Sequence, residues 1–199
     1  MVDDTQRIET ILEFWFGSVL PDGSAPKEKS ARWWRKDPQF DALVRSEFSD
    51  DIARAARGEL DSWKATARGR LALLVLLDQF SRNAYRDTPA AFANDKSALA
   101  IAQEGIDVGQ DRELRGDERG FFYMPLMHSE EATAQERAVE AFRRANEELG
   151  GYFEKSLEYA IRHRDIILRF GRFPHRNAIL GRESTAEELE FLKQPGSGF

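Results

Sequence analysis

Apolar residues recur at helical spacing along almost the whole chain. In the segment 8–16 they fall at positions i, i+3, i+4, i+7 and i+8, on one face of a helix, and Gly17 follows as a natural terminator. Asp37-Pro38 is the pair expected at a helix start, and a second apolar stripe follows it over 40–52. We therefore predict a helix over each of these two segments.

The most apolar part of the chain, residues 70–80, is compatible with two kinds of element. The residues Leu71–Leu77 are all apolar, as in a buried strand or in a helix that is buried on every side. Leu and Ala dominate this run, Val75 is its β-branched exception, and the sequence offers no partner strand. We therefore predict a central helix here.

Further helices are predicted from the signals at their ends. One helix is expected to close at Gly105, and a long apolar stripe over 153–168 is expected to stop at Gly171. Two capping boxes, Thr133–Glu136 and Ser184–Glu187, are expected to open two more helices. The chain 1–199 is thus predicted to form a single all-α domain of about eight helices, packed as stacked antiparallel hairpins, with a frayed tail over about 194–199.

Composition narrows the class of protein. The net charge of −6 and a pI near 5.3 argue against general binding of nucleic acid or of an anionic membrane, because both need a broad basic face. The chain has no cysteine, which excludes disulfides and thiolate chemistry. Neither a secretory signal nor a membrane-spanning segment is visible in the sequence. We expect the protein to be cytoplasmic.

One segment reverses the overall charge. Residues 161–182 contain six arginines and a single acid, Asp165, which gives a local charge of +5 in a chain of net charge −6. Aromatic and aliphatic residues are interleaved with these arginines, so the segment is not a solvated basic tail. A buried guanidinium needs an anion. That anion is either a carboxylate of the same protein, in a structural ion-pair network, or a ligand.

Three groups of polar residues are candidates for a shared site. The first lies at the exit of the central helix, the second at the turn near Pro125, and the third is the basic segment itself. All three histidines of the chain fall in the second and third groups. The candidate ligand-binding residues are Asp78, Arg82, Asn83, His128, Glu130, His163, Asp165, Arg169, Arg172, His175, Arg176 and Asn177.

Several long strings resemble those of one protein family. They are ILEFWFG, WWRKDPQFD, LALLVLLDQFSRNAYRDTPAAFAND, FFYMPLMHSEEATAQERAV and HRDIILRFGRFPHRNAILGRESTAEELEFL. Over residues 8–192 the chain resembles a widespread bacterial family of uncharacterised, domain-of-unknown-function proteins. The resemblance implies an all-helical, tetratricopeptide-repeat-like α-α superhelix. It implies no reaction.

Three functions remain open at this point. The first is a binding protein whose Arg-, His- and Asn-rich pocket takes an anionic small molecule or peptide, by a carboxylate or a phosphate. The second is a hydrolase or lyase in which His163, His128 or His175 acts as base, oriented by Asp165 or Glu130. The third is a protein-interaction scaffold that uses Trp33 and Trp34. We expect neither a cofactor nor a metal, because the nearby arginines would repel a cation. The sequence does not indicate the oligomeric state.

Overall fold

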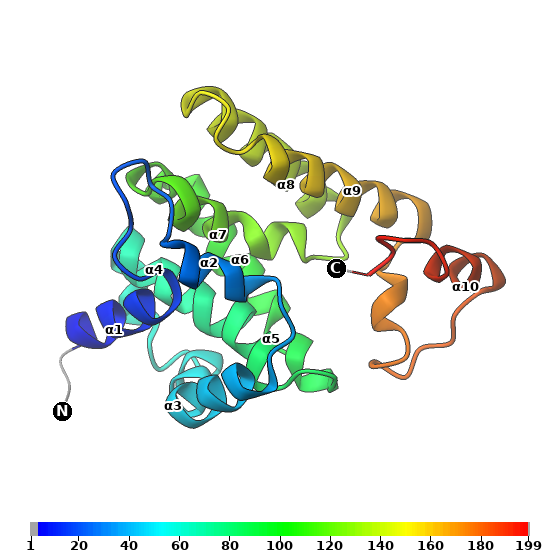
Figure 1. Cartoon of the computed structure of the whole chain (residues 1–199), viewed down its shortest axis with the longest axis horizontal. Helices are drawn as coiled ribbons and strands as arrows, with labels where there is room; N and C mark the ends of the chain where they lie inside the picture. Colours follow the sequence, from blue (N-terminus) through cyan, green and yellow to red (C-terminus); the bar gives the residue numbers. More distant parts are fainter. Residues whose placement is uncertain (1–3, 199) are drawn as a thin grey trace.

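The computed structural model describes residues 4–198, and these residues form helices and turns without any strand (Figure 1). The all-α prediction is therefore confirmed. The α-helices are α1 (Asp4–Phe16), α2 (Lys27–Trp33), α3 (Pro38–Ala56), α4 (Ala67–Leu74), α5 (Ser81–Ala84), α6 (Asp95–Asp107), α7 (Gly116–Met127), α8 (Ala132–Glu148), α9 (Glu154–Phe170) and α10 (Ala186–Leu192). Short 3-10 turns are η1 (Asp61–Ala65), η3 (Pro89–Phe92), η4 (Gln110–Glu113) and η5 (Pro174–Arg176), and η2 (Val75–Phe80) is π-helical.

Several helix ends lie where the sequence places them. The Asp37 side chain accepts hydrogen bonds from the backbone N–H groups of Gln39 and Phe40 at the start of α3, which satisfies two N–H groups that have no partner inside the helix. Gly17 and Gly171 adopt left-handed φ values of 68° and 69° after α1 and α9, a region that favours glycine. The predictions for these helices are confirmed.

Other helix ends differ from the predictions. Helix α8 begins before Thr133, and its N-cap Glu131 makes no side-chain cap hydrogen bond. The last capping box is formed by Thr185 and Glu188, one residue later than expected, since the Glu188 carboxylate is also drawn inward by other partners. Gly105 lies inside α6 because its missing side chain lets Arg70 and Phe122 pack against the helix backbone.

The predicted central helix is present but it is not uniform. Segments α4, η2 and α5 form one continuous helix over 67–84. It is π-helical over Val75–Phe80 and α-helical again from Ser81. The π-helical turn widens the backbone at Asp78, so that the Ser81 hydroxyl donates to the Leu76 carbonyl five residues earlier. Such turns insert one extra residue into a helix and are frequent at functional sites.

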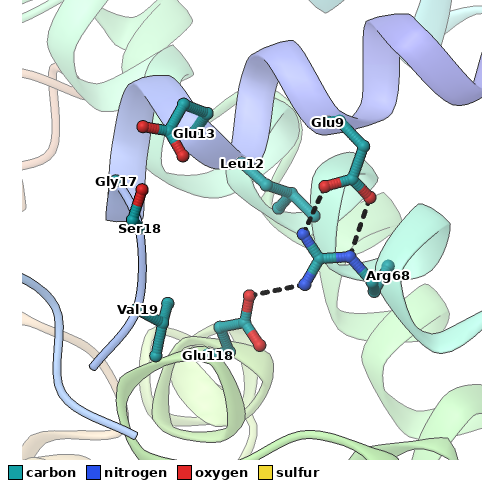
Figure 2. Close-up of a pocket in the computed structure, with 8 residues that line it drawn as sticks. All are labelled: Glu9, Leu12, Glu13, Gly17, Ser18, Val19, Arg68 and Glu118. Carbon is teal, nitrogen blue, oxygen red and sulfur yellow. Dashed lines mark hydrogen bonds and ion pairs between the residues drawn. The ribbon is translucent and has the colours of Figure 1, made fainter. Parts of the chain in front are cut away.

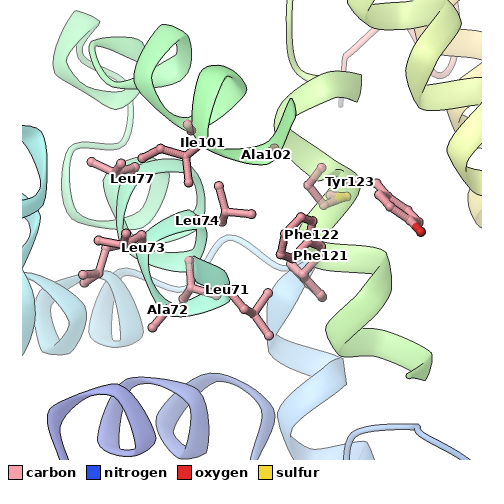
Figure 3. Close-up of a cluster of buried hydrophobic side chains, with 14 of the residues drawn as sticks. Leu71, Ala72, Leu73, Leu74, Leu77, Ile101, Ala102, Phe121, Phe122 and Tyr123 are labelled. Carbon is pink, nitrogen blue, oxygen red and sulfur yellow. The ribbon is translucent and has the colours of Figure 1, made fainter. Parts of the chain in front are cut away.

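The core forms around the central helix. Figure 3 shows Leu71, Leu74, Ile101 and Phe122 meeting between α4, α6 and α7. Every residue from 69 to 81 is buried, which explains why the sequence shows no polar face there. Burial of this apolar surface, at about 25 cal/mol per Å², is the main favourable term in folding.

The C-terminal part has a small core of its own. Helices α8 and α9 pack side by side, and the chain beyond Gly171 lies at the far end of α9, away from α1–α4 (Figure 1). Ile166, Ile167 and Phe173 form a second buried cluster there. In the expected tail, residues 194–198 form a turn in which the Ser197 hydroxyl donates to the Leu192 carbonyl, and Phe199 lies outside the described residues.

Candidate functional site

A buried carboxylate and an imidazole meet at the centre of the candidate site. Asp78 is 1% exposed in the π-helical turn, and its two oxygens lie 2.7 and 3.0 Å from His128 Nδ1. His128 follows the last residue of α7, which ends two residues after Pro125. Pro125 cannot donate a backbone hydrogen bond, and it thereby favours the helix end at this point. Gln79 donates to the same carboxylate at 2.5 Å, and Arg82 forms an ion pair with it at 2.8 Å.

Two arginines share a second carboxylate. Arg82 binds Asp95 in a bidentate manner at 2.9 and 3.0 Å, and Arg176 Nη1 donates to one of the same oxygens at 3.1 Å. Arg176 also donates to the His128 carbonyl at 2.9 Å. Its guanidinium lies 4.8 Å from the ring centre of Phe92 and 4.6 Å from that of Phe173. The network therefore joins the central helix, α6, the end of α7 and η5.

The electrostatics fix the protonation of the central pair. Burial disfavours an ionised Asp78, but the neighbouring Arg82 and His128 outweigh it and lower the pKa of the carboxyl group. Burial also lowers the pKa of His128, although the charge of Asp78 opposes this shift. At neutral pH the pair is an ionised Asp78 and a neutral His128 whose Nδ1–H donates to it. That tautomer leaves Nε2 with the lone pair.

The other two histidines both lie close to the ring of Phe173. The ring centres of His163 and His175 are each 5.6 Å from that of Phe173, and the His163 ring is 6.4 Å from that of His128. Burial, followed by the charges of neighbouring groups, lowers the pKa of His163 to about 3 and that of His175 to about 4. Both are therefore neutral at physiological pH. His163 Nδ1–H donates to the Tyr159 carbonyl at 2.8 Å.

Glu130 fastens the basic segment to the end of α7. Its carboxylate binds both terminal nitrogens of Arg182, at 2.7 and 2.9 Å, and accepts the backbone N–H of Phe173 at 2.8 Å. Burial tends to raise the pKa of Glu130, but Arg182 and this N–H lower it overall. Glu130 thus serves as an internal counterion.

The structure gathers part of the predicted set. Asp78, Arg82, His128, His163, His175 and Arg176 meet in one place, with Glu130 beside them. The remaining predicted residues have partners elsewhere. Asn83 donates to Asp41, and Asp165 is bound by Arg164.

Three more predicted residues contact the C-terminal helix. Arg169 binds Glu187 at the surface, and Arg172 binds both oxygens of the buried Glu188. The Asn177 amide donates to Ser184 Oγ and to the same Glu188 carboxylate, and it accepts from Arg182. These contacts attach α10 to the turn after α9.

Sequence reasoning missed three members of the network. Asp95, Arg182 and Glu188 are absent from the candidate residues that the sequence analysis names. Arg182 does lie inside the basic segment, and Glu188 stands three residues after Thr185 as a capping residue does. Nothing in the sequence pattern of Asp95 indicates that two arginines converge on it.

The two tryptophans of the scaffold hypothesis differ in exposure. Trp33 is half-buried and donates its indole N–H to the Trp15 carbonyl at 3.2 Å. Trp34 is 72% exposed and stacks on Phe121. A separate pair of surface hollows borders Arg68, their linings include none of the predicted site residues, and Figure 2 shows the smaller of the two.

Two further observations concern other kinds of site. Over residues 4–198, no group of three or more His, Asp or Glu side chains is arranged to hold a metal ion. In the same stretch no helix has both the length and the apolar character needed to cross a bilayer.

Comparison with known proteins identifies the family. Residues 11–196 match the family model described as bacterial protein of unknown function, DUF924, and the chain belongs to that family. The chain is similar to a protein of unknown function, ATU0120, from Agrobacterium tumefaciens. The two sequences are 41% identical and their structures superpose with a TM-score of 0.82, over 96% of this chain and 99% of the other. No curated protein matches the sequence.

Proposed function

We propose that the protein binds an anionic small molecule, or the carboxylate of a peptide, beside Arg176. The observation that carries this proposal is the incomplete neutralisation of Arg176. Within residues 4–198 its only carboxylate contact is one oxygen of Asp95, which Arg82 already holds in a bidentate pair. Arg176 Nε is buried and has no hydrogen-bond partner among residues 4–198.

The charge around Arg176 favours an additional anion. Burial first, and then the charge of Arg82, lower the pKa of Arg176 to about 10, which means that its positive charge is under-compensated where it lies. A ligand carboxylate or phosphate would relieve this cost by accepting charge-assisted hydrogen bonds. The neighbouring side chains of Arg82, His128 and His175 are half-buried, and a ligand would have to approach Arg176 past them.

Replacement of Arg176 by Lys tests the proposal, because Lys keeps the charge but lacks Nε and the planar fork. Arg172→Lys is the matched control, since Arg172 is neutralised by both oxygens of Glu188. The melting temperature is measured with added inorganic phosphate, succinate or acetate at constant ionic strength. We expect at least one anion to raise the melting temperature of the parent and of Arg172→Lys, but not that of Arg176→Lys. The proposal is wrong if no anion stabilises the parent, or if both variants lose the response equally.

A second candidate function is acid–base catalysis on the bound anion, as a hydrolase or lyase. It is favoured by the Asp78–His128 pair, in which a buried carboxylate fixes the tautomer and leaves Nε2 of a neutral imidazole as base. The pairing differs from the expected one, because Asp165 lies elsewhere and Glu130 binds Arg182. His128→Gln should abolish turnover of a panel of phosphate and carboxylate esters while leaving anion-induced stabilisation in place. Undiminished turnover by this variant would exclude His128 as the base.

Two further proposals concern the stacking of the helices and the location of the protein. We propose a tetratricopeptide-like stacking of helical hairpins, for which the packed α8–α9 pair and its short connection over 149–153 give support. We also propose cytoplasmic residence, with no nucleic-acid or membrane partner, on the grounds of the acidic composition. The scaffold function has less support, because Trp33 is engaged by Trp15 and only Trp34 of the pair is well exposed.

A further inference from the structure

Helix α2 and the residues that follow it, 27–36, lie on the surface of the protein, and we call them the α2 segment. None of the residues of α2 is buried, and among the other helices it contacts mainly α1. Its half-buried Trp33 stacks on Trp15 of α1, with 6.1 Å between the ring centres. Because a helix of seven residues is not stable in water alone, this contact holds α2 in place. The opposite side of α2 is open to solvent.

Trp34, at the C-terminal end of α2, is an exposed aromatic side chain that is held in a fixed position. It is 72% exposed, and its ring stacks on that of the buried Phe121, with 6.1 Å between the ring centres and 18° between the ring planes. It also meets Trp33 edge-on, at 6.4 Å. An indole fixed in this way loses little conformational freedom when a partner binds. Tryptophan is also enriched among the side chains that dominate binding interfaces.

The α2 segment is basic in an acidic protein. It contains five basic side chains and one acid, Glu28, which gives a local charge of +4 (five minus one) in a chain of net charge −6. Within residues 4–198 the ion pairs of this segment are Arg35 with Asp37 and Lys36 with Asp87, both at the surface. The other three basic side chains therefore have no carboxylate partner there. Since exposed ion pairs contribute little to stability, the two paired cations can also exchange partners.

The aromatic side chain and several of these cations share the exposed side of α2. Lys27, Ala31 and Trp34 stand at positions i, i+4 and i+7, which places them in one row along a helix, and all three are exposed. Ala31, between the other two, carries only a methyl group. Arg32 and Arg35 are exposed beside this row. The exposed side of α2 thus combines one apolar anchor with several cations.

We propose that the α2 segment binds a short acidic segment of a partner protein. An apolar side chain of the partner would lie on the indole of Trp34, and its carboxylates would pair with Lys27, Arg32 and Arg35. Charge complementarity selects an acidic partner.

Two other kinds of partner fit this surface less well. A bilayer needs a wide apolar face, whereas Trp34 is the only large apolar side chain exposed in the α2 segment. Nucleic acid needs a broader basic face than these few cations provide. The surface shares no residue with the site at Arg176, and it does not depend on the anion-binding function proposed there.

Three pentapeptides with blocked ends serve as probes of this surface. The first has four glutamates around a central phenylalanine, the second has a central serine instead, and the third has four lysines around the phenylalanine. Binding to the full chain is measured by calorimetry and by the NMR signal of the Trp34 indole N–H, assigned with Trp34→Phe. We expect the first peptide to bind most tightly and to shift that signal. Its affinity should fall as salt is added, because added ions screen exposed charges.

Variants of the surface and a matched pair elsewhere complete the test. Trp34→Ala should weaken binding of the first peptide at least about ten-fold, as is typical of a side chain that dominates an interface. Arg32→Gln should weaken it about two- to five-fold, the effect of one exposed ion pair. Tyr159→Ala and Arg162→Gln are the controls, since Tyr159 of α9 is 50% exposed with the Arg162 guanidinium 5.5 Å from its ring centre. These controls and Arg176→Lys should leave binding unchanged.

Several results would overturn the proposal. They are absence of peptide binding at millimolar concentration, equal binding of the serine or the lysine peptide, and losses in the control variants as large as that in Trp34→Ala. Binding of phosphatidylserine vesicles or of oligouridylate that depends on Trp34, in place of the acidic peptide, would assign the surface to another partner and overturn it as well. Dimerisation of the parent that Trp34→Ala abolishes, measured by sedimentation equilibrium, would do the same.

Discussion

Acidification should destabilise the protein through its buried histidines, and His163 gives the clearest case. This side chain is 4% exposed, and its pKa is lowered to about 3 from the usual 6.5. The unfolded chain takes up a proton at His163 as the pH falls through 6.5, whereas the folded chain stays neutral until about pH 3. The contribution of His163 to stability is therefore complete above pH 6.5 and is lost progressively below it.

The size of the effect follows from this difference in proton uptake. Each pH unit between the two pKa values costs about 1.4 kcal/mol of unfolding free energy per histidine. Between pH 6.5 and 4.5, His163 alone should therefore reduce the unfolding free energy by about 2 kcal/mol. That is a large share of the stability of an ordinary domain.

Urea unfolding of the parent and of His163→Gln at several pH values between 7 and 4.5 measures this contribution. Other titrating groups act in both proteins, so the difference between the two unfolding free energies isolates residue 163. We expect the variant to become more stable relative to the parent by about 2 kcal/mol as the pH falls to 4.5. A difference that does not vary with pH, or an NMR titration that places the His163 pKa near 6.5, would refute the reasoning.

Three other predictions concern the same structure. Gly105→Ala places a methyl group 2.4 Å from Arg70 Cδ and 2.5 Å from Phe122 Cζ, and should lower the unfolding free energy by about 1–3 kcal/mol in urea, whereas Gly198→Ala, which meets nothing within 4 Å, should leave it unchanged. Phe173→Ala, at a ring that is 0% exposed, should cost about 3–5 kcal/mol by the same assay, and the half-buried Phe191→Ala should cost clearly less. Asp78→Asn removes the charge that raises the pKa of His128, so the NMR titration of His128 should move to lower pH, and a shift to higher pH would contradict the assigned protonation.

Much of the fold follows from local signals in the sequence. Asp37, Gly17 and Gly171 act on their own helix ends, so their effect can be predicted without any knowledge of the tertiary structure. The π-helical turn at Val75–Phe80 could not be predicted, because every residue there is buried. The spacing of polar and apolar residues therefore does not indicate how many residues make up one turn of the helix. The position of the last capping box was missed by one residue because two capping-box patterns overlap there, Ser184 with Glu187 and Thr185 with Glu188.

The sequence predicts which residues belong to the candidate site better than it predicts which of them contact one another. The excess of arginine over 161–182 indicates that buried counterions must exist, but charge counting does not say which carboxylate each arginine meets. The i, i+4 pair of Asp78 and Arg82 forms because both lie on one helix. Asp165 and Arg169 have the same i, i+4 spacing, but Asp165 is bound by Arg164 and Arg169 binds Glu187 instead. The hollows beside Arg68 depend on three segments distant in sequence, and no local pattern marks them.

The separate small core of the C-terminal part has a consequence for how the molecule opens. Residues 171–198 are held to the rest by ion pairs at Arg169, Arg176 and Arg182 and by the Phe173 cluster, without a share in the large apolar interior. Such a region can detach as a cooperative unit while the remainder stays folded. Amide protons of α10 should therefore exchange with deuterium much faster than those of α4. An anion bound at Arg176 would stabilise the attached form of residues 171–198, and it would therefore slow the exchange of the α10 amides without affecting that of α4.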